Sequence, residues 1–234
     1  MNFDKRFASL DWDAVNSGLL ARGYEVIGEL CSDIECEGLL EQYDRPELFR
    51  KTVNMSQKNF GNGQYKYFAY PLPDLVRQIR FKFYGPLAKL ANEWAKLLGD
   101  AQVWPDKQQN FLDQCASAGQ TKAAPLMLKY VEGDYNRLHQ DLYGQVTFPF
   151  QVIILLSEPE VAFSGGDLIL VEKTPGMQLR AHSPKLKKGS AVIVPTQDRP
   201  VREASGWEKA EMQHGVTELL TGERLTLGII FHDA

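Results

Sequence analysis

The stretch RLHQDLYG, residues 137–144, places a histidine and a carboxylate two residues apart, at His139 and Asp141. Side chains two residues apart in an extended strand point to the same face of the sheet. An imidazole and a carboxylate on one face can converge on a single metal ion. The alternative is a polar patch at the end of a strand. Two ligands do not complete a metal site, so the choice depends on the rest of the chain.

A third ligand has to come from one of the three other histidines, His182, His214 and His232. His214, in EMQHGVTELLTGERLTLGIIF, is the best candidate because we expect it to open a strand and because Arg224 follows ten residues later. His182 lies in a polar connection, LRAHSPKLKKG, and is predicted to be solvated. His232, in IIFHDA, is predicted to be structural or exposed.

Two histidines and one carboxylate form the facial triad of non-haem Fe(II) oxygenases, which leaves positions open for a chelating cosubstrate and dioxygen. The usual chelator is 2-oxoglutarate, whose far carboxylate needs a buried cation, and the planar fork of an arginine suits it. LLTGER reads as a hairpin turn around Gly222. That hairpin would place His214 and Arg224 on one face, roughly 13 Å apart at about 3.3 Å per residue. The pattern therefore predicts iron ligands at His139, Asp141 and His214.

This constellation resembles the Fe(II)/2-oxoglutarate-dependent dioxygenases, whose fold is the double-stranded β-helix, or jelly roll. Their motif is His-x-Asp, then a distal His, then Arg-x-Ser/Thr about ten residues later. YVEGDYNRLHQD is also similar to the segment that leads into the first ligand in prolyl hydroxylases and AlkB-type repair enzymes. FSGGDLIL is similar to a Gly-Gly-acid-apolar strand of prolyl-hydroxylase-like members. The motif residues stand here as His139-Gln140-Asp141, His214 and Arg224-Leu225-Thr226.

The resemblance implies that Tyr130 contacts 2-oxoglutarate, together with Arg224 and Thr226. Each of the two uncharged residues has an ordinary alternative. Tyr130 could be an aromatic residue of the barrel, and Thr226 could be a common strand threonine. The resemblance also implies the reaction, in which dioxygen converts 2-oxoglutarate to succinate and CO₂ while a primary substrate is oxidised.

A wider likeness covers the whole chain. YKYFAYPLP, CASAGQT, YNRLHQDLYG and LGIIFHDA are similar to a group of bacterial 2-oxoglutarate/iron oxygenases thought to act on nucleic acids. Two substrate classes stay open: hydroxylation of a small molecule or protein side chain, and AlkB-like oxidative demethylation of alkylated nucleic acid. A third interpretation is a cupin-like jelly roll that binds a metal or ligand without turnover. Arg224 argues against it, because a metal binder has no need of that arginine.

The organisation of the chain favours an α+β fold. Residues 9–23, 32–43 and 74–98 have helical periodicity, with Asp11 or Ser9, the Ser32–Glu35 capping box and Asp74 as caps. From residue 126 onward the pattern changes to short strands: PLMLKYV, FPFQVIILLS, DLILVEK, MQLRAH, SAVIVPT and RLTLGIIF. We expect residues 1–125 to form a mainly helical buttress and a substrate loop, and residues 126–234 to form a double-stranded β-helix core. Both belong to one integrated domain, in which the helices support one sheet.

Charge and cysteine usage restrict the class of protein further. The net charge is −4, which disfavours a protein whose main task is gripping nucleic acid. The three cysteines fit no zinc template and are expected to be reduced thiols in a cytoplasmic protein. No apolar run is long enough to span a bilayer, and the first residues do not read as a signal peptide.

The segment 60–75, FGNGQYKYFAYPLPDL, is predicted to be a loop or a short hairpin. Its aromatic residues alternate with Lys66 and follow Lys58, and residues 44–96 hold ten lysines and arginines against four acidic residues. Aromatic and basic side chains together can hold single-stranded nucleic acid by stacking and phosphate contact. More often such side chains pack a loop onto the core, and both interpretations stay open.

Overall fold

Strand β14 (Leu219–Ile230) shows how the sequence pattern builds this fold. Alternate side chains of a strand point to opposite faces of its sheet. One set, which is apolar, packs in the hydrophobic core beneath the helices: Leu225, Leu227 and Ile229. The other set lines an internal cavity: Arg224, Thr226, Gly228 and Ile230. One strand therefore supplies both the core of the protein and the wall of its cavity.

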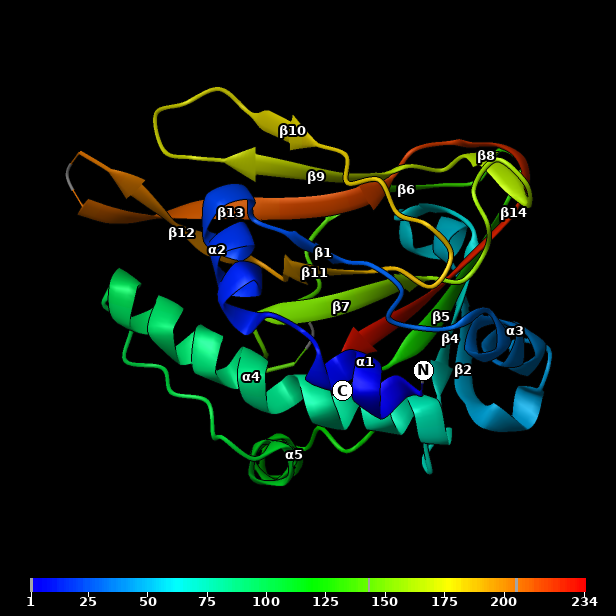
Figure 1. Ribbon diagram of the computed structural model, residues 1–234, viewed down its shortest axis with the longest axis horizontal. Helices are drawn as coiled ribbons and strands as arrows, with labels where there is room; N and C mark the ends of the chain where they lie inside the picture. Colours follow the sequence, from blue (N-terminus) through cyan, green and yellow to red (C-terminus); the bar gives the residue numbers. More distant parts are fainter. Residues whose placement is uncertain (1, 143, 205) are drawn as a thin grey trace.

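The computed structural model describes residues 2–142, 144–204 and 206–234, without the side chain of Lys58. Two antiparallel sheets face each other, and helices cover the outer face of the larger sheet (Figure 1). The larger sheet has the order β1 (Glu25–Ile27), β11 (Ala191–Pro195), β7 (Phe150–Leu155), β14, β5 (Leu126–Val131), β4 (Gln64–Phe68), β2 (Phe49–Asn54), with β8 (Phe163–Gly165) beside β14. The smaller sheet has the order β10 (Arg180–His182), β9 (Leu168–Lys173), β13 (Gly206–Val216), β6 (Tyr135–His139), β3 (Gly61–Asn62), with β12 (Asp198–Glu203) beside β13.

The helices begin and end where local chemistry requires. They are α1 (Phe3–Ala8), α2 (Trp12–Arg22), α3 (Asp33–Gln42), α4 (Asp74–Leu98) and α5 (Gln108–Ser117), with short 3₁₀ turns at Pro46–Leu48 and Met55–Lys58. Asp11 caps α2, and the predicted capping box of Ser32 and Glu35 opens α3. The prediction that Asp74 caps α4 is wrong, because Pro73 occupies the cap position and Asp74 is the first helical residue. Helix α5 was not predicted.

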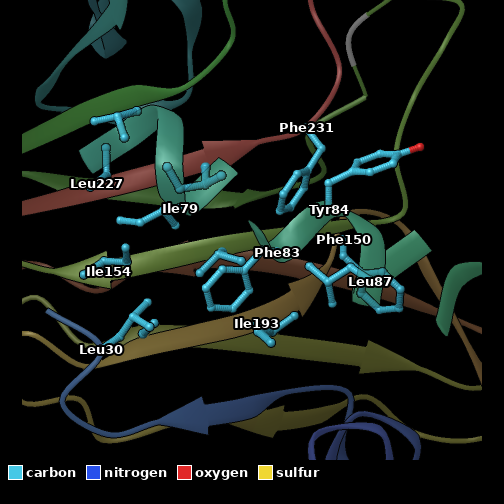
Figure 2. Close-up of a cluster of buried hydrophobic side chains, with 14 of the residues drawn as sticks. Leu30, Ile79, Phe83, Tyr84, Leu87, Phe150, Ile154, Ile193, Leu227 and Phe231 are labelled. Atoms are coloured by element: carbon cyan, nitrogen blue, oxygen red, sulfur yellow. The ribbon is translucent and has the colours of Figure 1, made fainter. Parts of the chain in front are cut away.

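Helix α4 carries most of the contact between the helices and the larger sheet. Its apolar face is buried against the outer face of β7, β11 and β14 (Figure 2). Burying one large apolar side chain contributes roughly 1.5–3 kcal/mol, so this layer is a main source of stability. The prediction of an α+β jelly roll with helices supporting one sheet is confirmed. The helix side chains in this contact include Ile79, Phe83, Tyr84 and Leu87, which face Phe150, Ile154, Ile193, Leu227 and Phe231.

The segment 60–75 is more ordered than predicted. Residues 64–68 form β4, a full strand between β2 and β5, and β2 was not predicted. The glycines beside it, Gly61 and Gly63, have positive φ angles of 127° and 122°, which gave the segment its loop-like composition. The alternation of Tyr65 and Tyr67 was the strand signal that this composition concealed. Four strands, β1 to β4, precede residue 126 and pair into the two sheets, so the division at residue 125 stays a prediction about organisation.

The three cysteines are buried and free, as expected. Burial raises the pKa of Cys36 to about 11. The prediction that His182 is solvated is wrong, because its ring is partly buried and packs edge-on against Tyr24, with 5.6 Å between ring centroids. His182 ends strand β10, which lies within the predicted strand MQLRAH. Within the described parts of the chain, no helix is long and apolar enough to cross a membrane.

Helix α4 also holds the segment that follows β14. The guanidinium of Arg80, which is 2% exposed, donates to the carbonyl oxygens of Ile230, Phe231 and His232, and pairs with Asp233 at 2.7 Å. This cluster fixes His232 in the core, where its Nδ1 accepts a hydrogen bond from the backbone N–H of Phe148. His232 is 1% exposed, which confirms its structural role.

Acid should destabilise the protein through His232. Burial, assisted by the charge of Arg80, lowers the pKa of His232 from 6.5 to about 4. Between these two pH values, His232 is protonated in the unfolded chain and neutral in the folded protein. The stability that depends on neutral His232 is therefore complete above about pH 6.5 and is lost as the pH falls towards 4. At about 1.36 kcal/mol per pH unit, the loss reaches roughly 2 kcal/mol at pH 5.

Thermal melts at pH 7.5 and pH 5 test this expectation against His232→Gln, whose amide oxygen can still accept the Phe148 hydrogen bond. The parent protein should lose several degrees more than the variant between the two pH values. Burial also lowers the pKa of His139, but that effect is common to both proteins. An equal loss in the two proteins would show that His232 does not carry the acid sensitivity.

Candidate metal centre

An irregularity in strand β6 turns His139 toward the cavity. On β13, Val216 pairs with Asn136 and His214 pairs with His139, so two residues of β6, 137 and 138, lie opposite the single Gly215 of β13. This β-bulge lets Asn136 and His139, three positions apart, both line the cavity. Bulges commonly redirect side chains beside active sites. The carbonyl oxygen of Arg137, within the bulge, lies 2.7 Å from Nδ1 of His139.

That contact fixes the protonation of the His139 ring. A carbonyl oxygen can only accept, so Nδ1 carries the proton and Nε2 keeps its lone pair. A histidine that ligates a metal usually donates its other N–H to a carbonyl or carboxylate in this way. Burial, and next the nearby His214, lower the pKa of His139, so the ring is neutral at physiological pH. His139 is therefore ready to act as a ligand through Nε2.

The structure brings His139, Asp141 and His214 together. One ligand atom of each lies within 4.8 Å of the others. Nε2 of His139 is 3.6 Å from Oδ1 of Asp141, and Nε2 of His214 is 3.3 Å from Oδ2. His139 ends β6 and Asp141 lies just beyond it, whereas His214 lies directly across the sheet on β13. Two nitrogens and one carboxylate at one point form a donor set that suits Fe(II).

The charge state of Asp141 also suits a cation. Burial raises the pKa of Asp141, but hydrogen bonding to His214 and the two histidine rings outweigh burial and lower the pKa to about 2. The carboxylate therefore stays ionised at neutral pH while it is largely excluded from water. An ionised carboxylate and neutral imidazoles are the forms that bind a metal.

The triad lies at the wall of the cavity between the two sheets. Strands β4, β5, β7 and β14 line it from the larger sheet, and β6, β9 and β13 line it from the smaller sheet. Most of the lining is apolar, and its few polar groups lie close to the triad and to Arg224. Sites of this composition typically bind small ligands, with the polar groups setting orientation.

Arg224 reaches this cavity by a route other than the predicted hairpin. Strand β13, with His214, belongs to the smaller sheet, and β14, with Arg224, belongs to the larger one. The chain crosses between the sheets after Val216. Gly222 lies inside β14 beside β8, where a Cβ atom would lie 2.1 Å from the carbonyl oxygen of Ala162. The hairpin register around Gly222 is therefore wrong, although both side chains line the same cavity from facing sheets.

The surroundings of Arg224 lack an anion. Its side chain is 3% exposed and lies against the ring of Tyr130, 5.6 Å from the ring centroid. Among the described residues, no carboxylate lies within salt-bridge distance of this guanidinium. Buried charges are normally paired, so the site fits a ligand that brings its own carboxylate. Tyr130 and Thr226, both buried, line the same end of the cavity.

The glycines of FSGGD allow this arrangement. Gly166 has a φ angle of 61°, and a Cβ atom there would lie 2.6 Å from Leu219 and 3.1 Å from Cδ of Arg224. A side chain at this position would clash with Leu219 and crowd Arg224. The second glycine of the pair thus has a physical reason in this chain, which is its close approach to these two side chains.

Two residues near the triad, Asn136 and Gln151, were not singled out from the sequence, whereas Phe60 belongs to the aromatic residues noted in segment 60–75. The Phe60 ring lies tilted beside the His139 ring, with 5.6 Å between centroids. Asn136 donates from Nδ2 to the hydroxyl of Tyr130 at 3.3 Å, and its Oδ1 is buried with no partner among the described residues. Gln151 lies 3.4 Å from Nε2 of His214. A signal existed for Gln151, since it is the one polar residue of the buried strand FQVIIL.

Comparison with known proteins agrees with this geometry. The family Oxygenase-NA, described as "Oxygenase, catalysing oxidative methylation of damaged DNA", matches residues 63–234. The uncharacterized protein Rv2227 of Mycobacterium tuberculosis is 42% identical over 167 residues, which cover 71% of this chain and 72% of that protein.

Solved structures share the fold at low sequence identity. A prolyl-4-hydroxylase of Pseudomonas putida aligns with a TM-score of 0.56 and 14% identity, over 96% of this chain and 100% of that one. A viral collagen prolyl hydroxylase from Paramecium Bursaria Chlorella virus-1, solved with 2-oxoglutarate, aligns with a TM-score of 0.52 and 16% identity, over 90% and 96%. The chain therefore belongs to the Oxygenase-NA family, a family of oxygenases and hence of oxidoreductases, and it shares the fold of these prolyl hydroxylases.

Proposed function

We propose that His139, Asp141 and His214 hold Fe(II), that Arg224 binds the far carboxylate of 2-oxoglutarate, and that the enzyme oxidises an alkyl group on a base of damaged nucleic acid. The observation that carries the proposal is the buried guanidinium of Arg224, which has no carboxylate partner among the described residues and lies in the same cavity as the triad. A protein that only stored a metal would have no reason to keep this cation out of water.

The chain's own residues prepare the site for the cosubstrate. Arg224 offers a preformed fork to a carboxylate, and the face of Tyr130 limits its movement. Apolar side chains of the cavity exclude water, which strengthens that ion pair. When bound, Fe(II) and 2-oxoglutarate use dioxygen to oxidise a substrate C–H bond, with release of succinate and CO₂.

The part of the cavity away from Arg224 supports a flat substrate. Tyr65 and Tyr67 of β4 line it, with their rings edge to face at 5.4 Å between centroids, and Phe60 flanks His139. Aromatic side chains bind bases by stacking, and an enzyme acting on a base needs a pocket for the extruded base. The guanidinium of Arg50 lies 4.6 Å from the ring centroid of Tyr67, which places a cation beside this wall.

The aromatic residues of segment 60–75 therefore have two different roles. Some line the cavity, as the binding interpretation requires, and others pack the segment onto the core. Phe68 is fully buried in the core, whereas Tyr70 bonds through its hydroxyl to Asp233 at 2.9 Å. Lys66 donates to the carbonyl oxygen of Tyr43 and so is not at the cavity. The side chain of Lys58 lies outside the described residues.

The chemistry we propose removes an alkyl group. One oxygen atom of O₂ enters succinate and the other enters a C–H bond of an N-methyl base. The resulting hydroxymethyl group breaks its C–N bond and leaves as formaldehyde, while a proton returns to the base nitrogen.

Single-stranded oligonucleotides with N-methylated bases should therefore stimulate succinate release and yield one formaldehyde per succinate. The unmethylated oligonucleotides are the control.

Tyr67→Ala should lower formaldehyde yield per succinate severalfold while 2-oxoglutarate binding stays unchanged, because Tyr67 lies away from Arg224. Base stacking contributes roughly 1–3 kcal/mol, so the Michaelis constant for the oligonucleotide should rise about 5- to 100-fold. Tyr70→Phe is the matched control, since it changes an aromatic residue of the same segment outside the cavity. If methylated oligonucleotides stimulate no turnover, but 2-oxoglutarate is still consumed with Fe(II), the nucleic-acid assignment is wrong and the iron site stands.

A further inference from the structure

Strand β7 carries a polar side chain where the fold favours an apolar one. Its residues Phe150, Val152 and Ile154 pack toward the helices, and Ile153 lies against the inner faces of β9, β11 and β13. Gln151, on the inner face, is 3% exposed and lines the cavity. β7 lies between β11 and β14, well inside the larger sheet. A buried amide costs free energy unless it is hydrogen-bonded.

The amide of Gln151 lies beside the proposed metal ligands. Nε2 of Gln151 lies 3.4 Å from Nε2 of His214, across the cavity and on the opposite sheet. Gln151 also hydrogen-bonds to the side chain of Asp141, whose Oδ2 lies 3.3 Å from that same Nε2 of His214. Gln151 therefore links the larger sheet to two proposed ligands that the smaller sheet supplies.

A bound metal would change what holds Asp141. Nε2 of His139 and Nε2 of His214 face the two oxygens of this carboxylate. His139 keeps its proton on Nδ1, and a ligating Nε2 of His214 would carry no proton, so neither ring could donate to Asp141 once a metal is bound. No backbone N–H of the described residues donates to this carboxylate. With a metal bound, the amide of Gln151 would be the neighbouring group that can donate a hydrogen bond to the Asp141 carboxylate.

We propose that Gln151 is a positioning residue of the iron site, which orients the Asp141 carboxylate from the facing sheet. This inference rests on the proposed function, because it assumes that the triad binds a metal. Hydrogen bonds to ligating carboxylates set the orientation of the ligand, and losing such a partner typically costs 10- to 100-fold in metal affinity or activity.

The alternative is that Gln151 only stabilises the fold. The two roles predict different results for Gln151→Leu, which keeps the side-chain size and removes the amide. A structural role predicts a lower melting temperature for the metal-free protein and unchanged metal affinity. A positioning role predicts metal affinity about 10- to 100-fold weaker. The melting temperature of the metal-free variant should be unchanged or higher, because a buried amide has become apolar in an apolar strand.

Binding of Mn²⁺, followed by electron paramagnetic resonance, gives the affinity without turnover, and thermal melts of the metal-free proteins give the stability. Gln213→Leu is the matched control: Gln213 adjoins His214 on β13, but its amide bonds to Glu211 at 3.2 Å. This control should bind Mn²⁺ like the parent protein. Gln151→Asn, which keeps the amide on a shorter side chain, should fall between the parent and the leucine variant.

The outcomes separate the two proposals. Weaker Mn²⁺ binding by Gln151→Leu, with the parent and Gln213→Leu unaffected, supports the positioning role. Equal Mn²⁺ affinity in the parent and Gln151→Leu overturns it while leaving the metal site intact. If the parent protein does not bind Mn²⁺ or Fe²⁺ at all, the proposed function fails and the role of Gln151 fails with it.

Discussion

Asp141→Ala should reduce Fe(II)-dependent succinate formation to background and remove measurable Fe(II) binding. The substitution leaves two neutral imidazoles without the anion that balances the metal charge. The expected effect exceeds the roughly 10- to 100-fold that follows loss of an outer hydrogen-bond partner, because a ligand itself is lost. Anaerobic Fe(II) titration measures the affinity, and succinate release from 2-oxoglutarate measures the turnover.

Two companion variants sharpen this expectation. Asp141→Glu should also be damaging, since a longer carboxylate displaces its oxygen in a site whose ligand distances tolerate only about ±0.2 Å. His232→Ala should keep Fe(II) binding, because His232 contacts Phe148 and the Arg80 cluster and does not line the cavity. Normal Fe(II) binding by Asp141→Ala would remove this residue from the proposed site.

The pH dependence of folding gives a second measurement on Asp141, without metal. The pKa of Asp141 is lowered to about 2, so its interactions with the two histidines stabilise the fold above the ordinary carboxyl pKa of 3.8. That stability is lost as the pH falls through 2. Acidification to pH 4 should therefore leave the Asp141 contribution to stability nearly complete, whereas the contribution of neutral His232 is lost over that range.

Part of the site could be predicted because its information is local. His139 and Asp141 lie in one short motif, and the alternation of β14 fixes which of its residues face the cavity. The pairing of His214 with His139 joins segments about 75 positions apart, and His214 was chosen from its predicted strand, from Arg224 ten residues later and from the family motif. What brings these rings together is the antiparallel register of β6 and β13, which the sequence pattern of β6 alone does not reveal.

The errors have one physical cause, which is that sheet membership is decided by long-range packing. Residues around Gly222 have the composition of a turn, yet this glycine lies within β14. The position holds a glycine because β8 approaches it closely. Segment 64–68 was predicted as part of a loop or a short hairpin because glycines and prolines flank it, yet its tyrosines alternate as a strand requires, and it pairs with two strands of the larger sheet. The bulge at Arg137 and the contact of Gln151 with His214 depend on the facing strands, so no local rule could supply them.

Arg224→Ala should weaken 2-oxoglutarate binding by roughly two to three orders of magnitude while Fe(II) binding persists. The ligand carboxylate would remain in a buried, apolar cavity without its cation. Breaking a buried ion pair by removing one partner costs about 3–5 kcal/mol, and about 1.4 kcal/mol corresponds to a factor of ten. The triad keeps all its ligands, since Arg224 lies on the opposite sheet from His139 and His214.

Arg224→Lys separates charge from geometry and completes the test. Lysine keeps the positive charge but loses the planar fork that pairs with both carboxylate oxygens, so its affinity should lie between the parent and the alanine variant. Calorimetric titration of 2-oxoglutarate into Mn²⁺-loaded protein gives each affinity. Two other arginines of the chain, Arg180 and Arg202, are exposed and do not line the cavity. If Arg224→Ala binds 2-oxoglutarate as tightly as the parent, no other arginine of the cavity lining could replace it, and the cosubstrate site must lie elsewhere.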